Sequence, residues 1–247
     1  MIKKTRTILF ASCVFLFALT ASIIVLYSQG YRFDFETLKI VQTGGLYFKV
    51  APRSAQVHIN GKLKDTTSIF TNSSLVKNLT PKIYAIEISK DGYYSWQKTL
   101  EVKEKQVTEA KNIILIPKVP EFTKLIATQT EIKNITSKFT AVATSSDGRK
   151  VIKANEHEIW IFFPKEDKTI FLTRFSENVG KIFWLNDNYL IFNVGNKIKA
   201  AEIDDRDRLN VIDITELKTP EIFWDSNSGK LYVLSEKTLY VSEKLLP

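Results

Sequence analysis

Residues 8–27 form an uninterrupted apolar run, ILFASCVFLFALTASIIVLY, without a charged residue, a proline or a glycine. A helix of about 20 residues rises about 30 Å, which matches the hydrocarbon thickness of a bilayer. Three basic residues, Lys3, Lys4 and Arg6, precede the run, and no acidic residue does. Because positive charge beside a first span favours the cytoplasmic side, we expect the N-terminus inside and the chain from Tyr31 onward outside the cytoplasmic membrane.

The same N-terminal segment has a second interpretation, a cleaved signal peptide. Small residues at Ala18, Thr20 and Ala21 would supply a cleavage site. The apolar run continues through residues 23–26, however, and this favours an uncleaved anchor. We therefore predict a single-pass membrane protein whose mature chain retains its first residues, Met1 or Ile2.

Charge is distributed unevenly along the chain, whose formal net charge is +8. Residues 31–117 carry 13 Lys and Arg against 8 Asp and Glu, whereas residues 118–247 carry 19 of each kind. A basic surface close to a membrane can meet anionic headgroups or acidic envelope polymers, and a solvated lysine-rich surface is the simpler alternative. Arginine clusters interleaved with aromatic residues are missing, so nucleic acid is not an expected partner. The single cysteine, Cys13, lies in the apolar run, so the exported part has no disulfide.

Beyond residue 30 the chain is expected to be mostly β, because short alternating or apolar runs recur between turn residues. Inward-facing positions are predicted at Tyr84, Ile86 and Ile88 and again at Trp96, Leu100 and Val102. Tight turns are predicted at four dipeptides, which are Asn60-Gly61, Asp91-Gly92, Asp147-Gly148 and Ser228-Gly229. A stretch from Val102 to Ala110 is compatible with either a helix or a strand.

The run NIILIPKVPEF contains two prolines directly after an apolar strand, at Pro117 and Pro120. Proline lacks the N–H that a central strand needs, so a strand and its domain should end there. These features give the expected organisation of the chain: a cytoplasmic tail and anchor (1–30), a connector (31–44), a small β-sandwich (45–117) and a further β-rich domain (122–247).

Four stretches between residues 45 and 117 follow each other with a characteristic spacing. They are the segment APRSAQVHINGK, the residues Leu79, Pro81 and Tyr84, the segment KDGYYSWQKTLEV and the closing segment VTEAKNIILIP. Together they resemble a PEGA domain over residues 45–117, about 30% of the chain. Two stretches depart from the family pattern: Pro52 to Ala55 reads PRSA, and Asp65 to Thr67 stands where the family has Gly-Thr-Pro. The resemblance implies a small β-sandwich of exported and cell-surface proteins, with a binding or spacing role. In it Ala55, Val57 and Ile59 face the core.

The expected position of Trp96 within this sandwich is the core. A surface-binding role for Trp96 or Tyr93 is the alternative.

Three C-terminal segments align with one another, beginning at Phe139, Ile182 and Ile222, and each runs strand, polar turn, strand, polar turn, strand. Their turn residues Asp147, Asp187 and Asp225 lie 40 and 38 residues apart. A period of about 40 with several short strands is typical of propeller blades. The segments resemble blades of TolB-like and WD40-like propellers, most visibly in Ser145 to Arg149, which reads SSDGR.

Residues 122–247 supply about three such blades, whereas propellers usually have four or more. Three arrangements remain open: an open three-blade fragment, closure through a second chain, and a truncated relative of a longer protein. Uncovered outer faces, with strands such as IWIFF from Ile159 and LYVL from Leu231, would favour homo-oligomers through the C-terminal half.

No catalytic, cofactor-binding or metal-ligating residue is predicted. His58 and His157 lie in no zinc-binding pattern, and both are interpreted as structural or surface residues. Asp204, Asp205 and Asp207 are spaced like calcium ligands, but the glycine and distal glutamate of an EF-hand loop are missing. This acidic cluster is therefore interpreted as a solvated hairpin tip.

These patterns together predict a membrane-anchored, extracytoplasmic protein of the cell envelope that binds or scaffolds without catalysis. Its expected partners are the membrane, through residues 8–27, and an envelope protein or polymer. One alternative is an envelope sensor or accessory subunit that relays contacts through the anchor. A cryptic hydrolase of the propeller type is the other alternative.

Overall fold

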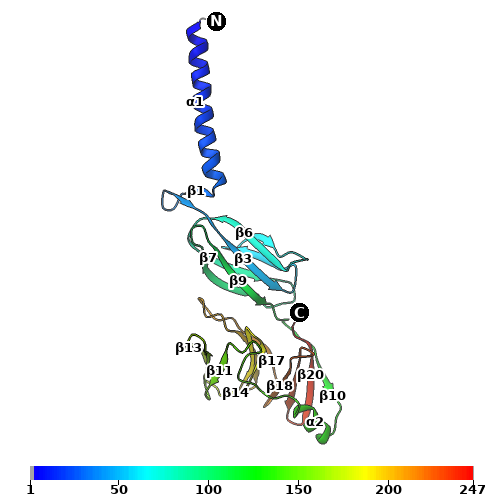
Figure 1. Ribbon diagram of the computed structural model, residues 1–247. Coiled ribbons are helices and arrows are strands. Elements are labelled where there is room, and N and C mark those ends of the chain that lie inside the picture. Colours follow the sequence, from blue (N-terminus) through cyan, green and yellow to red (C-terminus); the bar gives the residue numbers. More distant parts are fainter. Residues whose placement is uncertain (1–2, 247) are drawn as a thin grey trace.

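The computed structural model describes residues 3–246, and beyond one long N-terminal helix the protein is mostly β (Figure 1). Helix α1 (Lys3–Ser28) is long and apolar enough over Thr5–Ser28 to span a membrane. Its apolar window is not buried against any other part of the protein. Met1 and Ile2, whose retention the sequence predicts, lie outside the described residues.

The segment that was expected to connect the helix to the first domain is itself folded. It forms a two-stranded hairpin of β1 (Tyr31–Asp34) and β2 (Lys39–Gln42). The next strand begins at once, at Gly44, so almost no irregular chain separates the helix from the β-rich region.

Two sheets then pack face to face and are called the sandwich below. The first has the order β6-β3-β9, and the second has the order β5-β4-β7-β8. Their strands are β3 (Gly44–Ala51), β4 (Gln56–Ile59), β5 (Lys62–Thr66), β6 (Ser73–Leu79), β7 (Ile83–Ser89), β8 (Trp96–Glu101) and β9 (Val107–Ile114). Strand β9 pairs in parallel with β3, and the other pairings are antiparallel.

Alternating apolar residues from both sheets form one buried cluster between them. The inward positions predicted from the sequence are confirmed, since Val57 and Ile59 on β4 and Ala55 just before it are all buried. Trp96 is also buried in this cluster, with 3% of its surface exposed. Asn60-Gly61 forms the β4–β5 turn with positive φ at both residues, as predicted. The ambiguous stretch after Val102 ends in strand β9 and contains no helix.

Three antiparallel sheets follow, here called sheets I, II and III. Sheet I has the order β11-β12-β13, sheet II β14-β15-β16-β17, and sheet III β18-β19-β20-β10. Their strands are β10 (Phe122–Leu125), β11 (Val151–Ala154), β12 (Glu158–Phe163), β13 (Lys168–Arg174), β14 (Val179–Asn186), β15 (Tyr189–Val194), β16 (Lys197–Glu202), β17 (Val211–Glu216), β18 (Glu221–Asp225), β19 (Lys230–Ser235) and β20 (Thr238–Lys244).

The predicted repeat corresponds to these sheets. Asp147 and Asp187 lie in turns at equivalent places, and Asp225 is the last strand residue before the third turn; a strand antiparallel to the preceding segment follows each turn. One difference concerns the first repeat, whose opening segment, 139–145, is irregular and forms only an isolated bridge between Thr144 and Val151. The run TAVATSS is small and polar, so it offers too little apolar side chain to hold a regular inner strand.

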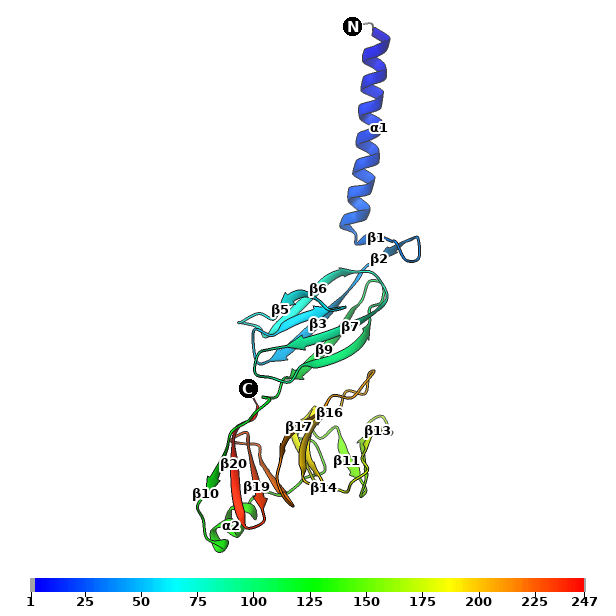
Figure 2. The ribbon, with the colours of Figure 1, turned by 180° about the vertical axis from the view of Figure 1, so that it is seen from behind.

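The three sheets stand side by side in an open arc below the sandwich (Figure 2). One apolar cluster lies between sheets I and II, and a second lies between sheets II and III. Leu231 and Val233 of sheet III belong to the second cluster, so one face of the LYVL strand is fully buried rather than uncovered. In the IWIFF strand the same holds for Ile159 and Ile161 of sheet I.

The two outer ends of the arc differ. Helix α2 (Gln129–Thr136) lies beside sheet III, and its Ile132 is buried. Phe139 stacks on Tyr232 of sheet III with ring centroids 5.1 Å apart. At the other end, Phe171 of sheet I is 54% exposed. The structure therefore leaves sheet I as the outer face with an exposed aromatic residue, where the sequence predicted two uncovered faces.

Candidate functional site

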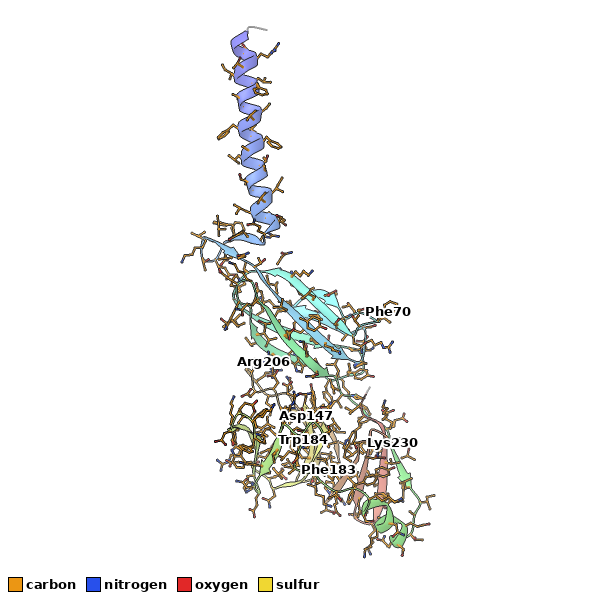
Figure 3. The ribbon with its side chains drawn as sticks, viewed as in Figure 1. Phe70, Asp147, Phe183, Trp184, Arg206 and Lys230 are labelled. Atoms are coloured by element: carbon orange, nitrogen blue, oxygen red, sulfur yellow. The ribbon has the colours of Figure 1, made fainter. Side chains whose placement is uncertain are left out.

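A groove of about 580 Å³ lies where the inner segments of sheets I, II and III meet. Figure 3 labels Asp147, Phe183 and Trp184 in this region. The groove is lined by Thr140, Val142, Thr144, Ser145, Ser146, Phe183, Trp184, Leu185, Asn186, Trp224, Ser226 and Leu246. The irregular segment of the first repeat forms one wall, so the missing inner strand of sheet I is what leaves the centre of the arc open.

Hydrogen bonds between neighbouring turns hold two walls of the groove together. The Ser145 hydroxyl donates to Asp147 Oδ1 at 2.6 Å, and the Arg149 N–H donates to the same oxygen at 3.0 Å. These bonds lower the pKa of the Asp147 carboxyl to about 2. The Ser146 hydroxyl donates to Asp187 Oδ1 at 2.6 Å, which links the turn of sheet I to that of sheet II.

Sheet III completes the pattern. The Ser228 hydroxyl donates to Asp225 Oδ2 at 2.6 Å, and this bond lowers the pKa of the Asp225 carboxyl. The three repeat aspartates therefore act as turn-fixing acceptors, as the residue type favours.

Two tryptophans form the aromatic part of the groove. The Trp184 indole N–H donates to the Ala143 carbonyl at 2.8 Å, which fixes this ring against the irregular segment. Trp224 is 5% exposed, and its buried indole nitrogen has no hydrogen-bond partner. A buried N–H without a partner is uncommon in folded proteins.

The groove lining contains no ionisable side chain, and its polar groups are hydroxyls and one amide. Flat indole faces beside a few neutral polar groups suit an uncharged ligand that has both apolar and hydrogen-bonding surface. A general acid or base would have to come from outside this lining.

A second polar centre joins the sandwich to sheet II, and it is called the seam below. The Lys98 ammonium lies 2.6 Å from Glu202 Oε1, and these side chains are 0% and 4% exposed. The Trp96 indole N–H donates to Glu202 Oε2 at 2.7 Å, and the Asn210 amide donates to Oε1 at 2.6 Å. Because the carboxylate has four donors and the ammonium three acceptors, every charge in the seam has partners.

The acidic cluster at 204–207 lies in the loop of the β16–β17 hairpin, where Asp205 and Asp207 are exposed as expected of a hairpin tip, whereas Asp204 is half-buried beside the seam. The Thr99 N–H of β8 donates to Asp207 Oδ2 at 2.7 Å. Arg206 donates to the Glu109 carbonyl at 2.9 Å and forms an ion pair with Asp204, and Figure 3 places it between the sandwich and the sheets below. The pKa of Asp204 is lowered overall: burial opposes ionisation, and the hydrogen bonds from Arg206 and the charge of Lys98 outweigh it.

Sequence reasoning missed the two central seam residues, Lys98 and Glu202. One signal was available for Lys98: it lies between Trp96 and Leu100 on the inward face of β8. A charge on the buried face of a strand needs a partner, so Lys98 indicates that another part of the chain supplies one. No comparable local signal marks Glu202, because its partners in the sandwich, Lys98 and Trp96, lie 104 and 106 residues away in the sequence.

The two histidines, His58 and His157, lie in different parts of the protein and do not form a common site. His58 lies on β4, and its buried Nδ1 has no hydrogen-bond partner. The His157 ring lies beside the Glu177 carbonyl in a loop at the edge of sheet I. Among the residues that the structure describes, no group of three or more His, Cys, Asp or Glu is placed to hold a metal ion.

No family model matches the chain, and no curated protein shows significant similarity to it. Solved structures are similar only at a low level. The crystal structure of Hsv2 from Kluyvelomyces marxianus is 10% identical with a TM-score of 0.25, over 78% of this chain and 49% of that one. A quinonprotein alcohol dehydrogenase-like protein from Bacteroides thetaiotaomicron is 13% identical with a TM-score of 0.25, over 72% and 45%. The chain thus spans about half the length of these proteins, and the scores are too low to support a conclusion about function.

Proposed function

We propose that this chain is a membrane-anchored, extracytoplasmic binding or scaffolding protein of the cell envelope, without a catalytic role. The central groove is the observation that carries the proposal, because it combines two tryptophans with neutral polar groups. An envelope polymer or a protein segment with uncharged polar groups is the proposed occupant. Residues 8–27 hold the protein in the cytoplasmic membrane, with the N-terminus inside.

We also propose the finer assignments of the domains. Residues 45–117 form a PEGA-like sandwich, supported by the matched sequence segments and by the two packed sheets. Residues 122–247 form a partial propeller of three blades, supported by the equivalent aspartate turns and by the inter-sheet clusters.

A variant that fills the groove tests the binding proposal. Ser226 is exposed and lines the groove, so Ser226→Trp should block it without removing a core side chain. Ser176 is exposed in the loop between β13 and β14, outside the groove, and Ser176→Trp is the matched control. Full-length protein of each kind would be purified from membranes in mild detergent, and the co-purifying components would be identified.

The expected result is one component that co-purifies with the wild type and with Ser176→Trp but is lost from Ser226→Trp. Identical components from all three proteins, or none, would show that the groove is not the binding site.

The sensor or accessory alternative has one observation in its favour. The sandwich is linked to the end of α1 through an ion pair between Lys82 and Glu36 and through the hairpin that carries Glu36. A contact made by the sandwich is therefore not separated from the anchor by a flexible linker. Crosslinking of the anchor to another membrane protein, dependent on groove occupancy, would favour this alternative over a passive scaffold.

A further inference from the structure

The hairpin of β1 and β2 has an apolar surface that no part of the described protein covers. Its four large apolar side chains are exposed by 47% (Phe33), 82% (Phe35), 73% (Leu38) and 66% (Ile40). A two-stranded hairpin alone is only marginally stable in water. A hairpin that also exposes several large apolar side chains is the kind of surface that contacts a membrane or another protein.

The apolar residues share a face because of the strand register. Phe33 is the cross-strand partner of Ile40, so both side chains project to the same side. Phe35 packs edge-to-face on Phe33, with ring centroids 5.1 Å apart. The neighbouring pair, Asp34 and Lys39, projects to the opposite side.

The polar side of the hairpin is turned toward the sandwich. Asp34 is 8% exposed, and its carboxylate accepts hydrogen bonds from the Thr37 hydroxyl at 2.7 Å and the Glu36 N–H at 3.0 Å. Lys82, at the start of the β7 region of the sandwich, lies 2.5 Å from Glu36. The face that carries Phe33 and Ile40 is therefore directed away from the sandwich.

The base of the hairpin is fixed to the end of α1. The Arg32 guanidinium lies 3.4 Å from the centre of the Tyr27 ring and donates to the Tyr27 carbonyl at 2.8 Å. The Gln42 amide donates to the Gln29 carbonyl at 3.0 Å, and the Thr43 N–H donates to the Gly30 carbonyl at 2.9 Å. Both views show the hairpin projecting sideways from the helix end (Figures 1 and 2).

We propose that this hairpin docks into the interfacial layer of the same bilayer that α1 spans, with lipid as its partner. The inference rests on the proposed anchor: if residues 8–27 fill the hydrocarbon core, the hairpin begins four residues beyond it. Aromatic residues favour that depth, which suits Phe33 and Phe35 on the apolar face. The hairpin then fixes the tilt and height of the sandwich above the membrane.

Depth-dependent quenching in the full chain tests this proposal. Cys13→Ser removes the single cysteine, and one new cysteine at a time carries an environment-sensitive NBD label. Phe35→Cys and Leu38→Cys report the hairpin, and Leu16→Cys reports the anchor. Phe70→Cys is the matched control, because Phe70 is 95% exposed and projects from the sandwich (Figure 3). Each protein is reconstituted into vesicles of phosphatidylcholine and phosphatidylglycerol that contain lipid spin-labelled near the headgroup or deep in the chain.

We expect the labels at Phe35→Cys and Leu38→Cys to be quenched several-fold more than the label at Phe70→Cys, and most strongly by the shallow spin label. Leu16→Cys should respond most to the deep one. Hairpin labels as unquenched as Phe70→Cys, beside a deep Leu16→Cys, would overturn the docking and leave the anchor intact. An unquenched Leu16→Cys would overturn both. Blue-shifted but unquenched hairpin labels that vary with the protein-to-lipid ratio would show a second copy in place of lipid, and would also overturn the proposal.

Discussion

Replacing Lys98 by methionine should destabilise the protein far more than removing a surface charge, because the change leaves the Glu202 carboxylate buried without its counter-ion. In the structure the Lys98 and Glu202 side chains are 0% and 4% exposed, so water cannot take over the role of the ammonium. Removing one partner of such a buried pair costs about 3–5 kcal/mol. The Asp204 and Arg208 carbonyls also lose their donor.

The measurement is urea unfolding of the full chain in detergent, followed by tryptophan fluorescence, since Trp96 lies in the seam. The free energy of unfolding falls by about 1–3 kcal/mol per M urea. The expected loss of stability should therefore lower the urea concentration at the midpoint of the Trp96 fluorescence change by about 1 M or more. Lys181→Met is the matched control. Lys181 forms an ion pair with Glu221 in which both side chains are nearly half exposed, so its loss should cost less than about 1 kcal/mol.

Replacing both charged seam residues by apolar ones provides a second test. Lys98→Met with Glu202→Leu removes the unpaired charge, but the Trp96 and Asn210 donors then lose their acceptor at about 1–3 kcal/mol each. The double variant should therefore recover only part of the loss. If Lys98→Met were no more destabilising than Lys181→Met, the seam would be hydrated, and a buried, fully paired charge cluster between the sandwich and sheet II would be refuted.

Three further outcomes follow from the same structure. Trp96→Ala should cost about 3–5 kcal/mol in the same urea experiment, the usual range for a buried large aromatic residue, whereas a loss below about 1 kcal/mol would place Trp96 on an exposed face. Because hydrogen bonds lower the Asp147 pKa to about 2, its contribution to stability is complete above pH of about 4 and is lost as the pH falls toward 2. In Asp147→Asn the melting temperature should therefore fall less steeply as the pH is lowered from about 4 to 2. The same slope as in the wild type would contradict this. A fragment of residues 119–247 should dimerise or aggregate in light scattering while residues 45–117 remain monomeric, since the outer face of sheet I exposes Phe171; a monomeric 119–247 with a cooperative melt would instead indicate a half that closes on itself.

The elements that the sequence predicts well are those whose signals are local. The apolar run 8–27 lies within helix α1, and the Asn60-Gly61 turn follows from residues that tolerate positive φ. Strand faces such as Tyr84, Ile86 and Ile88 follow from simple alternation, and all three residues are buried. Each of these needs only a few neighbouring residues to be specified.

Helix α2 was not predicted, although a local signal for it exists. Thr128 and Glu131 form a capping box, in which Thr128 accepts from the Glu131 N–H and Glu131 accepts from the Thr128 N–H. The helix has only eight residues, so its apolar periodicity is too short to stand out from the surrounding strands.

The seam and the groove could not be predicted from the sequence, because both depend on distant segments meeting. In the sequence Asp207 looks like any other loop aspartate. Only the hydrogen bond that it accepts from the Thr99 N–H shows that it links its loop to β8. The groove likewise needs three inner segments, about 40 residues apart, to converge on Trp184 and Trp224. A repeat period predicts equivalent positions but not what space remains between them.

Protease treatment of sealed, right-side-out membrane vesicles tests the central claim of a membrane-anchored protein whose bulk lies outside the cytoplasm. The full chain would carry an epitope tag at each end, and the fragments would be detected by immunoblotting before and after the membrane is opened with detergent. The account predicts that the C-terminal tag is digested in sealed vesicles while a short N-terminal fragment containing α1 is protected. A C-terminal tag that is protected until detergent is added would contradict the proposed orientation.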